Sequence, residues 1–107
     1  MNDQRELFRI SVHRKGFLRR RGETTICEID DLTEQGLQIV TEVPLTVGET
    51  VALEFQLVDR VVIHCALLVT HVKEPWIGGR IIQISTEHQD ALTRFIEQMI
   101  SANLAGM

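Results

Sequence analysis

The sequence of 107 residues lacks the long apolar segment that would place it in a membrane. Its longest apolar run, residues 61–72, is shorter than the roughly 20 residues that a membrane-spanning helix needs, and His64 and His71 interrupt it. The N-terminal residues are polar and basic, without the apolar segment of a signal peptide. We therefore expect a cytoplasmic protein that does not contact a membrane.

Metal-binding and catalytic patterns are also scarce. Cys27 and Cys65 lie far apart and form no C-x-x-C pair, so we expect two buried, reduced thiols. The four histidines lack zinc-type spacing; His64 and His71, seven positions apart in one expected strand, would face opposite sides if that strand is regular. No glycine-rich phosphate loop follows a strand, and no serine has the surroundings of a nucleophile. We expect no metal, no cofactor and no enzymatic activity.

Charge is distributed unevenly along the chain. Residues 1–21 hold seven of the eleven basic residues and two acidic ones, which gives a net charge of +5. Residues 22–107 carry −9, so the whole chain carries −4 at pH 7. A basic arm on an acidic body suggests an anionic partner; the alternative is a basic loop that is merely solvated.

The hydrophobic pattern predicts a mainly β protein. Apolar and polar residues alternate in short segments separated by turn-forming residues, which is typical of half-buried strands. We expect six or seven strands, at residues 8–13 with a continuation through 16–18, and then at 24–30, 36–40, 50–57, 61–71 and 78–84, with a turn at 73–77. Their close spacing favours an antiparallel barrel or sandwich within one domain, residues 1–107.

An amphipathic helix follows the strands. From Thr86 onward the apolar residues recur every three or four positions, which places Leu92 and Phe95 on one helical face. Residues 86–89 fit a capping box. We expect the helix, residues 86–102, to bury its apolar stripe against the barrel; the alternative is a contact between subunits of a homodimer.

Two polar segments stand out against this background. Residues 31–36, Asp-Leu-Thr-Glu-Gln-Gly, separate two expected strands, so the chain must reverse there. Asp31 and Thr33 can hydrogen-bond the nearby backbone, and Gly36 can adopt positive φ. Upstream, Arg5 and Arg9 stand four positions apart, before the first strand.

Together these segments resemble the paired signature of the PilZ domain family, an Arg-x-x-x-Arg followed by Asp/Asn-x-Ser-x-x-Gly. Asp31 follows Arg9 by 22 positions. Residues 77–82 and the C-terminal helix also resemble the last strand and helix of the family, so the likeness spans nearly the whole chain.

The resemblance implies an architecture and a ligand. The implied fold is a six-stranded antiparallel β-barrel over residues 10–84, with a flexible arginine arm at 1–9 and the C-terminal helix at 86–102. The family's commonest ligand is the bacterial second messenger cyclic di-GMP, which has two guanines and two phosphates.

The resemblance also assigns roles to residues. Arg5 and Arg9 would bind guanine edges or phosphate through their guanidinium forks, and Asp31 would accept hydrogen bonds from guanine N1 and N2. Thr33, where the family usually has serine, would offer its hydroxyl, and Gly36 would let the backbone approach the ligand. Gln4, where many members have a further arginine, leaves open whether one ligand or two bind. The accessory candidates are Gln4, Arg14 and Arg80.

Three functions remain open at this point. The first is a cyclic di-GMP receptor whose arm becomes ordered on binding and signals to a protein partner that the sequence does not identify. The second is a PilZ-like adaptor that binds no nucleotide and acts through protein contacts in pilus assembly or motility. The third is a small barrel that binds nucleic acid through its basic arm. The acidic body, the absence of tyrosine and an aromatic fraction of 5% disfavour the third function.

Overall fold

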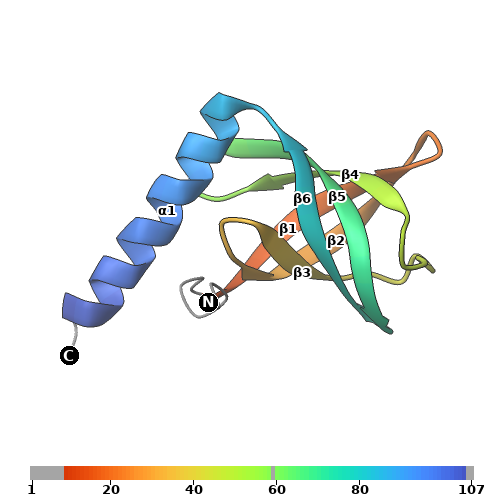
Figure 1. Ribbon diagram of the computed structural model, residues 1–107, viewed down its shortest axis with the longest axis horizontal. Helices are drawn as coiled ribbons and strands as arrows, with labels where there is room; N and C mark the ends of the chain where they lie inside the picture. Colours follow the sequence, from red (N-terminus) through yellow and green to blue (C-terminus); the bar gives the residue numbers. More distant parts are fainter. Residues whose placement is uncertain (1–8, 59, 106–107) are drawn as a thin grey trace, which may run out of the picture.

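The computed structural model describes residues 9–58 and 60–105 and shows a closed β-barrel followed by one helix (Figure 1). The strands are β1 (Ile10–Arg20), β2 (Glu23–Leu32), β3 (Gly36–Val40), β4 (Thr50–Gln56), β5 (Val62–Lys73) and β6 (Trp76–Ile84). The order around the barrel is β1-β2-β3-β6-β5-β4, and β4 pairs with β1 to close it. All pairs are antiparallel, which confirms the expected six-stranded barrel.

The bounds of β5 and β6 differ from those expected. The predicted turn over residues 73–77 shrinks to Glu74 and Pro75, because Trp76 and Ile77 already pair with β3 on one side and with β5 on the other. β5 and β6 are therefore longer than predicted, and β6 lies between β3 and β5 from Trp76 onward. The outer surface of these three strands carries part of the site described below.

The interior of the barrel is apolar because the strands alternate between inward and outward residues. In β4, for example, Val51, Leu53 and Phe55 are buried while the residues between them are exposed. Cys27 and Cys65 lie in the same core as free thiols, as expected. Burial raises the pKa of both thiols to about 11, so they remain protonated and unreactive at neutral pH.

Helix α1 (Thr86–Ala105) leaves the barrel after β6 and lies at one end of it, with its C-terminal end directed away from the strands (Figure 1). Leu92, Phe95 and Ile96 are buried in the same core as the strands, which confirms the predicted burial of the apolar stripe. The helix extends three residues beyond its expected end at residue 102. Within the described residues, no helix is long and apolar enough to cross a membrane.

The start of α1 corrects the predicted capping box. Ser85, not Thr86, is the N-cap, since the Ser85 Oγ accepts a hydrogen bond from the backbone N–H of His88 at 3.1 Å. His88 then occupies the third helical position, and its Nδ1 accepts a hydrogen bond from the backbone N–H of His64 in β5 at 3.1 Å. The helix begins at Thr86, the predicted first residue, and the His88 contact joins its first turn to β5.

Ser85→Ala should therefore lower the free energy of unfolding by about 1 kcal/mol, the usual cost of losing an N-cap hydroxyl. Thr86→Ala is the matched control and should change it by less than about 0.5 kcal/mol, because Thr86 is exposed. Urea denaturation followed by circular dichroism measures both. A larger loss for Thr86→Ala than for Ser85→Ala would contradict the assignment of Ser85 as the cap.

Candidate functional site

The turn between β2 and β3 is held together by Thr33. Its Oγ accepts hydrogen bonds from the backbone N–H groups of Gln35 (3.2 Å) and Gly36 (2.9 Å), and it donates to the Gly36 carbonyl at 3.1 Å. A hydroxyl has one donor and two acceptor sites, so the turn uses all three. These bonds confirm the prediction that Thr33 hydrogen-bonds the nearby backbone and shapes the turn.

The expectation of a positive φ at Gly36 is wrong, and the structure gives another reason for glycine there. Its φ is not positive, but a Cβ at this position would collide with the backbone carbonyl oxygen of Gly79 in β6. The backbone N–H of Ile81 also donates to the Gln35 carbonyl at 2.7 Å, which ties the turn to β6. Glycine therefore permits close packing of the turn against β6.

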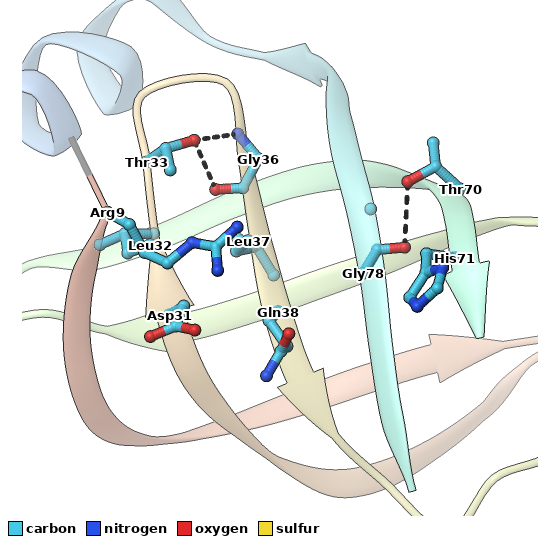
Figure 2. Close-up of a pocket in the computed structure, with 11 residues that line it drawn as sticks. Arg9, Asp31, Leu32, Thr33, Gly36, Leu37, Gln38, Thr70, His71 and Gly78 are labelled. Atoms are coloured by element: carbon cyan, nitrogen blue, oxygen red, sulfur yellow. Dashed lines mark hydrogen bonds between the residues drawn. The ribbon is translucent and has the colours of Figure 1, made fainter. Parts of the chain in front are cut away.

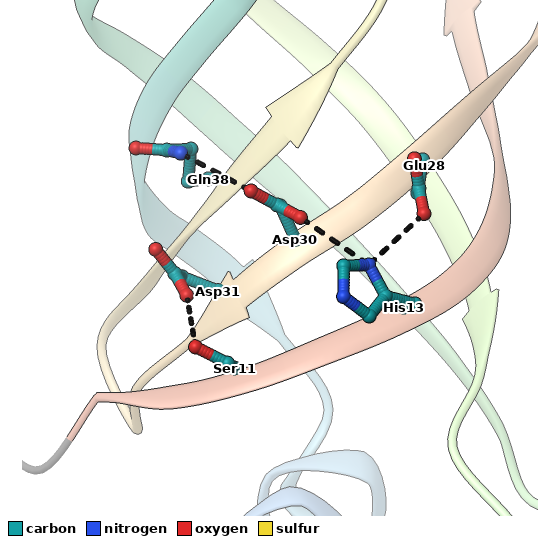
Figure 3. A network of polar contacts seen from close by, with 6 residues as sticks. All are labelled: Ser11, His13, Glu28, Asp30, Asp31 and Gln38. Atoms are coloured by element: carbon teal, nitrogen blue, oxygen red, sulfur yellow. Dashed lines mark hydrogen bonds and ion pairs between the residues drawn. The ribbon is translucent and has the colours of Figure 1, made fainter.

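Asp31 lies near the end of β2, just before this turn, and is half-buried. The Ser11 hydroxyl on β1 donates to Asp31 Oδ1 at 3.2 Å, which fixes one carboxylate oxygen (Figure 3). On the other side, Asp31 is the register partner of Gln38 in β3. The carboxylate is thus held on the outer surface of the barrel with acceptor sites to spare.

A pocket of about 320 Å³, which we call the motif pocket, lies on this outer surface (Figure 2). Figure 2 shows the Arg9 guanidinium reaching over Leu32 and Leu37 into its centre. The volume falls within the usual range for small-molecule sites, about 300–1,000 Å³. Its lining residues are Arg9, Asp31, Leu32, Thr33, Gly36, Leu37, Gln38, Thr70, His71, Gly78 and Gly79.

Four of the sequence-predicted site residues therefore meet at one pocket, namely Arg9, Asp31, Thr33 and Gly36. Arg5 and Gln4 lie outside the described residues.

Two accessory candidates, Arg14 and Arg80, lie elsewhere. Arg14 Nε donates to the Leu57 carbonyl at 2.8 Å, a structural contact between β1 and the end of β4. Arg80 lines a separate cavity of about 470 Å³, together with Glu34 and Gln35.

Seven further pocket residues were not predicted as part of the site: Leu32, Leu37, Gln38, Thr70, His71, Gly78 and Gly79. A bulge in β5 between Val69 and His71 turns both Thr70 and His71 outward. His64 and His71 are therefore both exposed, and the expectation of opposite faces is wrong because the strand is not regular. The only sequence signal for this side of the pocket is the pair of adjacent polar residues Thr70 and His71 near the end of β5.

A second polar cluster lies beside the pocket on β1 and β2 (Figure 3). His13 Nδ1 lies 3.2 Å from Glu28 Oε2 and 3.5 Å from Asp30 Oδ1, and Gln38 Nε2 donates to Asp30 Oδ2 at 3.5 Å. One ligand-type atom each from His13, Glu28 and Asp30 lies within 4.8 Å of the others, although spacing along the sequence gave no metal motif. His13 and Glu28 are exposed, so these pairs add little to stability.

Solved structures with the same fold include three bacterial proteins. The PilZ domain of YcgR from Escherichia coli, solved with c-di-GMP, superposes with a TM-score of 0.77 at 20% identity, covering 94% of each chain. The Bacillus subtilis inhibitor of motility MotI/DgrA gives 0.76 at 15% identity over 92% of this chain and 52% of that protein. The Borreliella burgdorferi PlzA protein, in complex with c-di-GMP, gives 0.62 at 15% identity over 82% of this chain and 39% of that protein.

This chain spans about half the length of MotI/DgrA, and identities this low establish the fold alone. A sequence comparison with curated proteins finds no match. The family model of the PilZ domain, however, matches residues 3–98, which is most of the chain and includes both sequence motifs. The chain therefore belongs to the PilZ domain family.

Proposed function

We propose that this domain is a cytoplasmic receptor for cyclic di-GMP, which binds at the motif pocket and signals to a protein partner. The observation that supports this most directly is the meeting of Arg9 with Asp31 and its turn in one pocket, although 22 residues separate Arg9 from Asp31 in sequence. Two proteins with the same fold, YcgR and PlzA, were solved with this dinucleotide. The proposed activity is binding, without catalysis.

The chemistry of the pocket suits this ligand. A guanidinium can bind the O6 and N7 edge of guanine or a phosphate in a bidentate fork, and it can stack on a base. Arg9 offers such a group in the centre of the pocket, and Arg5 on the preceding arm would supply a second. The Asp31 carboxylate can accept hydrogen bonds from the N1 and N2 donors of guanine. It would repel a phosphate, because both groups are negatively charged.

The signal would come from the arm that precedes β1. Arg9 already reaches into the motif pocket, so binding would draw Arg5 onto the outer surface of the barrel beside it, while the turn held by Thr33 stays in place. The ordered arm would then create or cover a surface for a partner protein, which is an ordering switch. In this mechanism the barrel provides a fixed platform and the ligand contributes the free energy that orders the arm.

Isothermal titration calorimetry with cyclic di-GMP tests the proposal. The wild type should bind saturably, and both Arg5→Ala and Asp31→Ala should lose most of the affinity. Arg94→Ala is a matched control, because Arg94 is exposed on α1 and does not line the motif pocket. The stoichiometry decides between one ligand and two, and sedimentation of the complex reports on a homodimer.

Absence of binding at high micromolar ligand, by a protein shown to be folded, would contradict the proposal. It would favour a PilZ adaptor that acts only through protein contacts. Tight binding of single-stranded nucleic acid instead of cyclic di-GMP would favour the third function.

A further inference from the structure

The motif pocket continues beyond the two sequence motifs along a row of outward-facing residues. In register, Ser11 pairs with Asp31, Asp31 with Gln38, Gln38 with Gly78, and Gly78 with His71. This row crosses five neighbouring strands, β1, β2, β3, β6 and β5. A ligand that begins at Asp31 therefore meets Gln38, Gly78 and His71 next along the surface.

Gly78 leaves a gap in the row. Figure 2 shows Thr70 and His71 on one side of Gly78 and Leu37 with Gln38 on the other. A Cβ built on Gly78 would lie 3.5 Å from the His71 Cβ, so any larger side chain there would fill the space beside His71. The absence of a side chain makes Gly78 the floor of a slot between Gln38 and His71.

The slot suits a planar base better than a phosphate. Its floor is backbone that is paired on both sides, with β3 and β5, and the Gly78 carbonyl also accepts a hydrogen bond from Thr70 Oγ at 3.3 Å. Its walls are a neutral amide and an imidazole, which can each donate and accept hydrogen bonds at a base edge. Asp30 and Asp31 lie on the Gln38 side, where their negative charge disfavours a phosphate.

We propose that the slot over Gly78 seats the second base of the cyclic dinucleotide, with Gln38 and His71 contacting its edges. This inference rests on the proposed function, since it extends the same site. The first base lies at Arg9 and Asp31, and the ligand spans β3 and β6 to reach the bulge of β5. Specificity for a dinucleotide over a mononucleotide follows, because only a ligand with two bases occupies both ends of the row.

Calorimetry of Gly78→Val and His71→Ala with cyclic di-GMP tests the slot. Gly78→Val should weaken binding at least about tenfold by filling the slot, and His71→Ala about three- to tenfold by removing one wall. His64→Ala is the matched control, since His64 is an exposed histidine on the same strand that does not line the pocket. It should bind as the wild type does.

A second measurement keeps the test decisive if Gly78→Val fails to fold. The chain has four histidines, and their ring resonances can be followed by nuclear magnetic resonance during a titration of the wild type. The ring of His71 should shift on binding, while those of His64 and His88 should not.

Wild-type binding that is lost in Asp31→Ala but unchanged in His71→Ala, with a static His71 ring, would overturn the slot and leave the proposed function standing. No binding by the folded wild type would overturn both.

Discussion

Gly36→Ala is expected to lower the free energy of unfolding by about 1–3 kcal/mol, the usual range for an added group in a filled space. The new Cβ would overlap the backbone carbonyl oxygen of Gly79, and a backbone atom in a paired strand cannot move aside as a flexible side chain can. The turn would have to separate from β6, which disturbs Thr33 and the end of β2 as well. Binding of cyclic di-GMP should therefore weaken together with stability.

Gly78→Ala provides the contrast. Its Cβ would lie 3.5 Å from the His71 Cβ and 4.0 Å from the His71 carbonyl oxygen, both ordinary contact distances, and the φ of Gly78 is not positive. This substitution should leave the free energy of unfolding within about 0.5 kcal/mol of the wild type, or raise it slightly, because alanine has fewer unfolded conformations to lose. Urea denaturation of the two variants measures the difference. Equal stabilities would show that the turn is not packed against β6 as tightly as the structure has it.

The fold could be predicted from the sequence because the physical signals for it are local. Alternation of apolar and polar residues identifies half-buried strands, and the spacing of Leu92, Phe95 and Ile96 identifies a helical face. Ends of elements are harder, since they depend on partners that are distant in the chain. β6 begins at Trp76 because β3 and β5 pair with it there, and α1 is capped by Ser85 in a register that also brings His88 to β5.

The site could be predicted only where it coincides with sequence motifs. Arg9 and Asp31 were predicted as a pair from their residue types and spacing, and the structure places both at one pocket. Gln38 and His71 were not predicted, because their place in the pocket depends on cross-strand register and on a bulge in β5. For Gly36, the expectation of a positive φ was wrong. A turn glycine suggests positive φ, whereas the structure uses its lack of a side chain for close approach to β6.

Arg9→Ala is expected to weaken cyclic di-GMP binding by about 1.5–3 kcal/mol, which is roughly tenfold to a hundredfold in the dissociation constant. The substitution removes a charged donor that reaches the centre of the motif pocket. Stability should not change measurably, because the side chain is exposed and precedes β1, where it adds nothing to the core. Calorimetry gives the affinity, and urea denaturation of the same protein gives the stability.

Two further arginine substitutions separate a directed contact from general attraction. Arg9→Lys keeps the positive charge but loses the planar fork, so it should recover only a small part of the lost affinity. Arg14→Ala is the matched control on β1. Arg14 is half-buried and donates to the Leu57 carbonyl, so its loss should lower stability and leave the affinity of the folded protein nearly unchanged.

If Arg9→Lys bound as tightly as the wild type, Arg9 would act by charge alone. If Arg9→Ala unfolded the domain, the side chain would belong to the scaffold and not to the ligand site. The proposed role therefore requires that Arg9 and Arg14 show opposite effects, with affinity lost in one and stability lost in the other.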